Sequence, residues 1–175
     1  MTTVRMEKLP ISAARIARRV AALGKEISAR VRKEQGRDGK PLVLAVVMKG
    51  AFIFAADLAR RLTMPCEIEF LRARSCAGRK NSRVRVERFD AAMFRGRDVL
   101  VVEGVLDTGR TLRAILARLR RAKPRRVYVC VLLRKKRARQ VPVPADFVGF
   151  DIPDVFIVGC GSCATAWHTG GETEV

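Results

Sequence analysis

Hydrophobic residues in the first third of the chain follow two different periods. After Ser12, which is a plausible helix N-cap, apolar side chains recur at spacings of three and four from Ile16 to Val31. This pattern predicts an amphipathic helix that ends near the glycines of EQGRDGKP. The next run, LVLAVV, has no polar position, as expected for a strand buried on both faces. We expect a turn at MKG and a second helix over AFIFAADLARRL.

The same alternation continues through the rest of the chain. CEIEFL and DVLVV predict strands, and between them RARSCAGRKNSRVRVER is polar and basic, which predicts a mobile loop. TGRTLRAILARLRRA predicts a helix, RVYVCVLL a strand, and the tail holds two short apolar pieces, FVGF and VFIVGC, separated by DIPD. Strands that alternate with helices at this spacing predict an α/β fold with a mainly parallel sheet flanked by helices. Because no repeat or linker interrupts the pattern, we expect a single domain over residues 1–175.

Ligands of such sheets bind beyond the carboxyl ends of the strands, where three loops are expected. They are Lys49-Gly50, Glu103 to Thr111, and Arg134 to Arg137. The second loop runs directly into a predicted helix, whose first N–H groups are unpaired and favour an anion. A plain N-capped helix start is the alternative, and the preceding apolar strand with Glu103 favours phosphate. The loop lacks the glycine spacings of nucleoside triphosphatases and of dinucleotide-binding turns, which excludes both classes.

Positive charge dominates the composition. The chain has 36 Lys and Arg against 17 Asp and Glu, a formal net charge of +19, and thirteen of the basic residues lie between Arg110 and Arg139 without one acid. Such a field concentrates anions, whether phosphorylated metabolites or nucleic acid. Basic side chains that only solvate helix faces are the third possibility, and charge alone does not separate the three.

Two further classes are disfavoured. The longest apolar stretches have about seven residues, far below the roughly 20 that span a bilayer, and no secretory signal pattern is present, so we expect a cytoplasmic protein without membrane contact. Five cysteines without framework spacing predict free thiols, with Cys66 and Cys130 as small buried hydrophobes. Cys160 and Cys163 form a C-x-x-C near His168, but one pair lacks the four ligands of a zinc site, which favours incidental thiols over a metal or redox role.

The stretch VLVVEGVLDTGRTL resembles the motif that binds phosphoribosyl pyrophosphate (PRPP) in type I phosphoribosyltransferases. That motif is an apolar strand, two acids, two apolar residues and then D-[TS]-G-x-T. VVMKGAFIFAADLARRL, CEIEFLRARSCAG and VPADFVGFDIPDVFIVGCG are similar, in this order, to the pyrophosphate loop, the strand before the flexible catalytic loop and the purine-recognition end of the hypoxanthine-guanine (6-oxopurine) branch. The resemblance implies the type I phosphoribosyltransferase fold, with a small base-binding hood formed from both chain ends. It also implies a reaction in which hypoxanthine or guanine and PRPP give IMP or GMP and pyrophosphate.

The resemblance also implies roles for the residues that would meet the sugar and its phosphates. Glu103 would hold a ribose hydroxyl and a magnesium ion. The magnesium ion would neutralise the pyrophosphate leaving group. Lys49 and Gly50 would receive pyrophosphate, and Ser75 would lie in the flexible loop. The 5′-phosphate would lie in a cradle of consecutive residues, Thr108, Gly109, Arg110 and Thr111.

A second group of residues would meet the purine. Asp107 would face N7 of the base as general acid and base, and Lys135 would donate a hydrogen bond to O6. Phe156 would stack on the base, and the backbone of Ile157 would read its edge. Members of the family form dimers or tetramers, so the resemblance also implies a homo-oligomer.

Four positions depart from the family pattern. Gly104 replaces the second acid of the motif, Cys76 stands in place of a tyrosine in the flexible loop, and Cys163 replaces the aspartate that holds a second magnesium. The tail TAWHTGGETEV does not supply the usual basic residue. Two hypotheses follow: a purine salvage transferase with full or weakened activity, or an impaired homologue that binds a purine nucleotide as a regulator or oligomer partner and contacts nucleic acid through its basic face. If the lost acid is the main defect, Gly104→Asp raises turnover.

Overall fold

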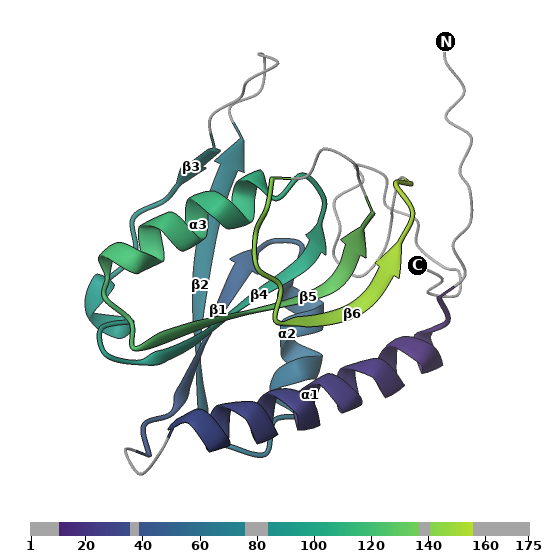
Figure 1. Ribbon diagram of the computed structural model, residues 1–175, viewed down its shortest axis with the longest axis horizontal. Helices are drawn as coiled ribbons and strands as arrows, with labels where there is room; N and C mark the ends of the chain where they lie inside the picture. The colour runs from purple at the N-terminus through teal and green to yellow at the C-terminus, as the bar shows by residue number, and fades with distance from the viewer. Residues whose placement is uncertain (1–10, 36–38, 76–83, 137–140, 156–175) are drawn as a thin grey trace.

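Six strands form one sheet, in the order β3-β2-β1-β4-β5-β6 (Figure 1). The computed structural model describes residues 11–35, 39–75, 84–136 and 141–155. The strands are β1 (Leu42–Met48), β2 (Cys66–Ser75), β3 (Val84–Val86), β4 (Asp98–Leu106), β5 (Arg126–Lys135) and β6 (Phe147–Ile152). All neighbouring pairs are parallel except β2 and β3. The predicted α/β fold with a mainly parallel sheet is therefore confirmed.

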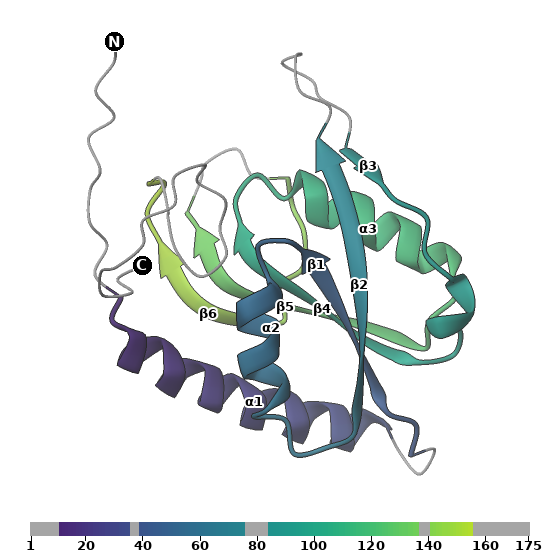
Figure 2. The same cartoon turned by 180° about the vertical axis from the view of Figure 1, so that it is seen from behind.

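Helices cover both faces of this sheet (Figures 1 and 2). Helices α1 (Ala13–Gln35) and α2 (Phe52–Ala59) lie on one face, α3 (Arg110–Arg121) lies on the other, and a short 3-10 turn, η2 (Ala91–Met93), precedes β4. Alternate residues of β1 point to the two sides: Leu44 and Val46 pack against α1 and α2, whereas Val43, Ala45 and Val47 pack against α3. This division explains why LVLAVV has no polar position.

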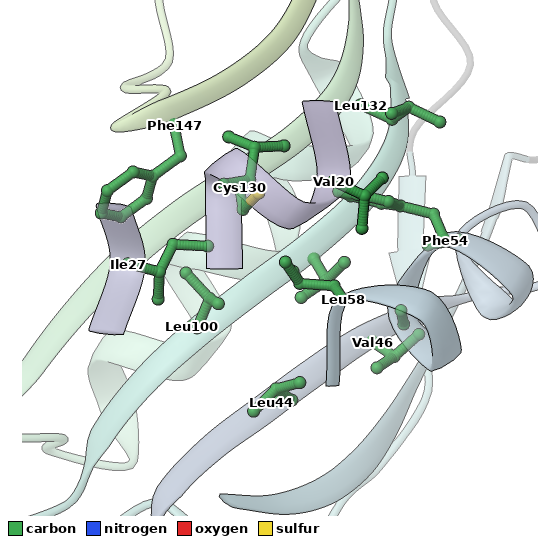
Figure 3. Close-up of a cluster of buried hydrophobic side chains, with 14 of the residues drawn as sticks. Val20, Ile27, Leu44, Val46, Phe54, Leu58, Leu100, Cys130, Leu132 and Phe147 are labelled. Atoms are coloured by element: carbon green, nitrogen blue, oxygen red, sulfur yellow. The ribbon is translucent and has the colours of Figure 1, made fainter. Parts of the chain in front are cut away.

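The core between the sheet and the first two helices is shown in Figure 3. Val20 and Ile27 of α1 and Phe54 and Leu58 of α2 belong to one buried cluster with side chains of the sheet, which include Leu44, Val46, Leu100, Cys130 and Leu132. Cys130 is fully buried there, and this burial raises the pKa of its thiol. Its predicted role as a small buried hydrophobe is confirmed, while Cys66 is only half-buried.

The connections of the sheet leave β1 and β4 in opposite directions. From β1 the chain passes through α2 to β2, and from β4 it passes through α3 to β5 on the other side of the pair. Because β1 and β4 are parallel neighbours, their carboxyl ends lie together at the point where the strand order reverses. In open α/β sheets this is the position where ligands bind.

Two segments differ from their predictions. Only the two ends of the basic stretch expected as a mobile loop differ from that prediction: its start extends β2 to Ser75, and Val84–Val86 forms β3, while residues 76–83 lie outside the described residues. Strand β3 pairs with β2 in antiparallel register from Ser75 and Val84 to Ala73 and Val86. The alternation in RVRV is the signal for this hairpin, because Val86 and Ala73 both pack against the core under α3. The second difference is Glu103, which lies inside β4 and not in a loop, since its strand continues to Leu106.

The remaining helices and strands lie where the pattern predicts them. FVGF lies within β6, whereas the second apolar piece of the tail, from Phe156 onward, is outside the described residues. The predicted hood would be formed from both chain ends, and residues 1–10 and 156–175 of these ends also lie outside the described residues. In the part of the chain that the structure describes, no helix is long and apolar enough to cross a membrane.

Candidate functional site

A cavity of about 240 Å³ lies at the carboxyl ends of β1 and β4. It is lined by the last residues of β1, by Ala73 of β2, and by the end of β4 with the first turn of α3. Five residues singled out by the sequence meet in this lining: Glu103, Asp107, Thr108, Gly109 and Thr111. The topology therefore brings the acids and the predicted phosphate loop to one place.

The loop before α3 is shaped to receive an anion. Gly109 is the N-cap of the helix and has a φ of 76°, in the left-handed region that glycine tolerates best. A Cβ atom there would also lie 2.7 Å from the carbonyl oxygen of Val141, whose own N–H donates to the Thr108 carbonyl at 3.0 Å. The N–H of Arg113 donates to the carbonyl of Gly109, which makes it the first bond of the helical ladder. The N–H groups of Thr111 and Leu112 precede that bond and can donate to a phosphate.

Glu103 is a half-buried carboxylate, and the hydrogen bonds that hold it among the described residues come from backbone N–H groups. The N–H of Gly104 donates to its Oε1 at 3.1 Å, and the N–H of Val105 also donates to it. Burial raises the pKa of this carboxyl from its ordinary value of 4.5 to about 7, although the two backbone hydrogen bonds act in the opposite direction. Among the described residues no Lys or Arg forms an ion pair with Glu103. A hydroxyl group or a cation of a ligand would therefore stabilise its charged form.

Gly104 packs directly against the loop that follows β1. A Cβ atom at Gly104 would lie 2.7 Å from the carbonyl oxygen of Gly50 and 3.1 Å from its carbonyl carbon, whereas a Cβ atom at Gly50 would meet nothing within 4 Å. The peptide between Met48 and Lys49, in the same loop, is cis. The glycine at position 104 therefore allows close packing, because any side chain there would require the Lys49-Gly50 loop to move.

A buried lysine lies between two carboxylates beside the cavity. The Nζ of Lys135, at the end of β5, is 3.9 Å from Oδ1 of Asp107 and 3.7 Å from Oδ1 of Asp154. The lysine side chain is only 11% exposed, while the two aspartates are 43% and 41% exposed. Asp154 is a site residue that the motifs do not single out. Its signal is the order of FVGF and DIPD, which places an acid just beyond the carboxyl end of a strand.

The other predicted site residues have different positions. Lys49 is exposed and does not line the cavity, and Gly50 touches the site only through Gly104. The side chain of Arg110 is exposed as well, so only its backbone lies at the phosphate loop. Ser75 ends β2, two residues beyond Ala73, which lines the cavity. The remaining positions, Cys76, Phe156, Ile157, Cys160, Cys163 and His168, lie outside the described residues.

The third predicted loop is partly strand. Arg134 and Lys135 are the last residues of β5, and Arg134 forms a two-point ion pair with Asp151 of β6, at 2.6 and 2.9 Å. This pair lowers the pKa of the Asp151 carboxyl through the hydrogen bond from Arg134. It holds the carboxyl ends of β5 and β6 together, and so positions the segment that carries Asp154.

Comparisons with known proteins agree with this geometry. A family model described as "Phosphoribosyl transferase domain" matches residues 12–164. The chain is 42% identical to a hypoxanthine-guanine phosphoribosyltransferase of Mycobacterium avium over 153 residues, which is 86% of this chain and 75% of the relative. It is also similar to the structure of a Trypanosoma cruzi hypoxanthine phosphoribosyltransferase in complex with the product IMP, with a TM-score of 0.84 and 30% identity over 100% of this chain and 96% of the other.

A second T. cruzi structure bears on assembly. It was determined in work on the role of the C-terminal region in the oligomeric state and enzymatic activity of that enzyme. Its TM-score to this chain is 0.79 at 29% identity, over 94% of this chain and 87% of the other.

Proposed function

The chain belongs to the hypoxanthine-guanine branch of the phosphoribosyltransferase family, and from this premise we propose how its site works. It is a purine salvage transferase that joins hypoxanthine or guanine to PRPP and releases pyrophosphate with IMP or GMP. The observation that carries the proposal is the single cavity in which Glu103, Asp107 and the N-terminus of α3 meet, with Lys135 beside it. These groups supply what a sugar phosphate and a purine require.

The phosphoribosyl group binds along the end of β4. The 5′-phosphate accepts hydrogen bonds from the backbone at Thr108 to Thr111 and from the two threonine hydroxyls, and the positive end of α3 adds a favourable field. Each hydrogen bond to a charged phosphate contributes about 1.5–3 kcal/mol. Pyrophosphate lies toward the Lys49-Gly50 loop, which Gly104 allows to approach β4 closely.

The purine lies between Asp107 and Lys135. A lysine only donates hydrogen bonds, so it fits O6 of hypoxanthine or guanine and rejects the amino group that adenine carries at the same position. When N9 of the base attacks C1′ of the ribose, the ring loses a proton, and the carboxylate of Asp107 accepts it from N7. In the reverse direction Asp107 returns the proton. Phe156 and Ile157, which lie outside the described residues, keep only the roles that the resemblance implies.

Magnesium is expected to bind together with the substrate's phosphates. Within the described ranges, no three His, Cys, Asp or Glu side chains cluster tightly enough to hold a metal alone. Mg²⁺ commonly uses one or two protein carboxylates and completes its shell with phosphate oxygens and water, so Glu103 suits it. When bound there, Mg²⁺ would supply positive charge that stabilises the leaving pyrophosphate.

The alternative of a nucleotide-binding regulator has less support. The relatives described above carry enzyme names, and the described part of the site keeps both Glu103 and Asp107. A contact with nucleic acid is not needed to explain any residue of the cavity. The loss of the second acid at position 104 is partly explained by packing, because the β1 loop occupies the space that a side chain would need.

Product formation tests the proposed function directly. The purified chain is incubated with PRPP, Mg²⁺ and one base, and pyrophosphate and nucleotide are measured together. Hypoxanthine or guanine should give equal amounts of pyrophosphate and IMP or GMP, while adenine should give neither above background. Binding of GMP without turnover of either 6-oxopurine would contradict the proposed transferase activity and favour the hypothesis of a nucleotide-binding regulator.

A homo-oligomer is proposed as well, through one apolar surface. Four large side chains on adjacent elements are between 45% and 52% exposed: Phe52 and Ile53 of α2, and Ile68 and Phe70 of β2. The rings of Phe52 and Phe70 are 6.4 Å apart, so these residues form one patch. Contiguous apolar patches of this kind mark protein interfaces. A second copy of the chain would cover it and would lie next to the Lys49-Gly50 loop.

A further inference from the structure

A groove of about 820 Å³ lies between the β2–β3 hairpin and α3. Its floor is apolar and is formed by Val84 and Val86 of the hairpin and by Ala114 and Ala117 of α3. The two alanines lie three residues apart on one face of the helix, and their small side chains leave the space open. None of these residues lines the cavity at the ends of β1 and β4.

Five arginines belong to the lining of this groove. Arg74, Arg85 and Arg88 come from the hairpin segment, and Arg118 and Arg121 come from α3, one turn beyond the alanines. Arg74 and Arg85 are paired directly across β2 and β3 and alternate with Ala73 and Val86, which pack under α3, so these two side chains lie on the other face of the sheet. Glu87 is the one acid in the lining, and its carboxylate pairs with Arg74 at 3.0 Å. Arg118 lies over the ring of Phe89, with 5.5 Å between the guanidinium carbon and the ring centre.

Four of the five arginines have no acidic partner in the described part of the chain. Arg85, Arg88, Arg118 and Arg121 form no ion pair with any described Asp or Glu. Like charges that face one another across a groove repel. Elsewhere in this molecule an arginine near other basic residues is neutralised: Arg125 forms an ion pair with buried Asp98. The groove thus concentrates unneutralised guanidinium groups from two separate elements around one hollow.

We propose that this groove binds a ligand with a phosphate chain, either a nucleoside polyphosphate or inorganic polyphosphate. Guanidinium groups present planar forks that match phosphate oxygens, and several forks that converge from two sides suit two or more consecutive phosphates better than one. The volume lies within the range of pockets for small organic ligands. The apolar floor offers a surface for the nucleoside, so a nucleotide should bind more tightly than the bare chain.

The groove adjoins the active site through both of its walls. The hairpin wall begins at β2, which ends at Ser75, and the helix wall is α3, whose first turn is the proposed 5′-phosphate loop. A ligand that fixes the hairpin against α3 would therefore change the position of both elements relative to the cavity. We expect such a ligand to alter the apparent affinity for PRPP.

Calorimetry on the full chain tests the site with two probes, inorganic triphosphate and ATP, at physiological ionic strength and with IMP in excess. The double variant Arg88→Ser/Arg121→Ser should weaken binding of both probes by at least about tenfold. The matched control, Arg113→Ser/Arg120→Ser, removes the same charge from exposed positions of α3 outside the groove and should change binding by less than about twofold. The ratio of the two wild-type affinities shows whether the nucleoside contributes.

Three outcomes would overturn the proposal. The first is no binding of either probe to the wild type. The second is equal weakening in both double variants, which would mean general attraction to a basic protein. The third is binding of a short single-stranded RNA that the Arg88→Ser/Arg121→Ser change abolishes, while neither triphosphate competes, which would assign the groove to nucleic acid. Because Arg88 and Arg121 are exposed, neither variant should disturb folding, and circular dichroism checks this.

Discussion

At the scale of single residues, Gly104 and Gly50 determine how closely the β1 loop can approach β4. The two glycines face each other, but only Gly104 lacks room for a Cβ atom. A carboxylate at position 104 would lie against a backbone carbonyl oxygen, which is both a steric and an electrostatic conflict. The structure therefore changes the expectation that follows from the motif alone, in which an acid at this position restores turnover.

We predict that Gly104→Ala and Gly104→Asp each lower the free energy of unfolding by about 1–3 kcal/mol, because they force the Lys49-Gly50 loop away from β4. Gly50→Ala, the control on the facing residue, should change it by no more than about 0.5 kcal/mol. Urea unfolding measures both. We also expect that Gly104→Asp fails to raise the rate of IMP formation. Equal stability of the two alanine variants, or faster turnover of Gly104→Asp, would refute this account of the glycine.

Glu103 makes a second residue-scale prediction, which concerns pH. Burial raises the pKa of its carboxyl from 4.5 to about 7, so the folded protein holds this proton more tightly than the unfolded chain does. Ionisation therefore costs stability: the contribution of Glu103 is present below pH 4.5 and is lost as the pH rises to about 7. The loss is at most about 3.4 kcal/mol. Glu103→Gln cannot ionise and should not show it.

The measurement for Glu103 is urea unfolding of the wild type and Glu103→Gln in parallel, without ligand, across this pH range. The difference in unfolding free energy between the two proteins should shift against the wild type as the pH rises. Parallel pH profiles would show that Glu103 ionises as an ordinary surface carboxylate.

At the scale of elements, the backbone of α1 lies almost directly against the turn that follows α2. A Cβ atom on Gly24 of α1 would lie 2.6 Å from the carbonyl oxygen of Arg61. Beside it, the hydroxyl of Ser28 donates to the Gly24 carbonyl at 2.7 Å and accepts the N–H of Thr63 at 3.1 Å. The glycine and the serine together fix how α2, and with it the Lys49-Gly50 loop, sits on the sheet.

We therefore expect Gly24→Ala to destabilise the protein by about 1–3 kcal/mol, although alanine is the better helix former by up to about 1 kcal/mol. Lys25→Ala, at the next and exposed position of the same helix, should stay within about 0.5 kcal/mol of the wild type. Thermal unfolding of the three proteins measures the difference. A Gly24→Ala variant that is as stable as the wild type would show that α1 and the turn after α2 can move apart without loss of unfolding free energy.

Most of the elements could be predicted from periodicity, and the exceptions have physical causes. Buried strands such as LVLAVV and amphipathic helices such as the one after Ser12 carry strong patterns. The β2–β3 hairpin is short and highly basic, so its RVRV alternation is hidden by charge, and its pairing depends on α3, which follows later in the chain. The site shows the same division: local motifs predict Asp107 to Thr111, whereas Asp154 enters through the pairing of β5 and β6.

At the scale of the whole molecule, the net charge is +19, and a cluster of arginines and an exposed apolar patch lie on different sides of the sheet. The arginines of α3 lie on one face of the sheet, while Phe52, Ile53, Ile68 and Phe70 lie on the face that carries α2 (Figure 2). Stable interfaces bury about 800 Å² per partner, so a homo-oligomer needs this patch together with neighbouring residues. Assembly through this patch would leave the basic face of α3 open.

We predict that Ile68→Asp/Phe70→Asp lowers the mass of the particle in solution toward the 19.5 kDa of one chain. Arg113→Asp, which places an acid on the α3 face, should leave the mass of the wild-type particle unchanged. Light scattering after gel filtration measures all three proteins. A wild type that is already monomeric, or a double variant with the same mass as the wild-type oligomer, would contradict the assignment of this surface.

The central claim is that Asp107 moves the proton of the purine, and steady-state kinetics with hypoxanthine and PRPP test it most directly. Asp107 and Asp154 both lie near Lys135, but only Asp107 lines the cavity, so Asp154→Asn is the matched control for Asp107→Asn. We predict that Asp107→Asn lowers kcat/KM for hypoxanthine by about 100-fold or more, while Asp154→Asn lowers it by less than about tenfold. A wild type without IMP formation, or equal losses in the two variants, would contradict the account.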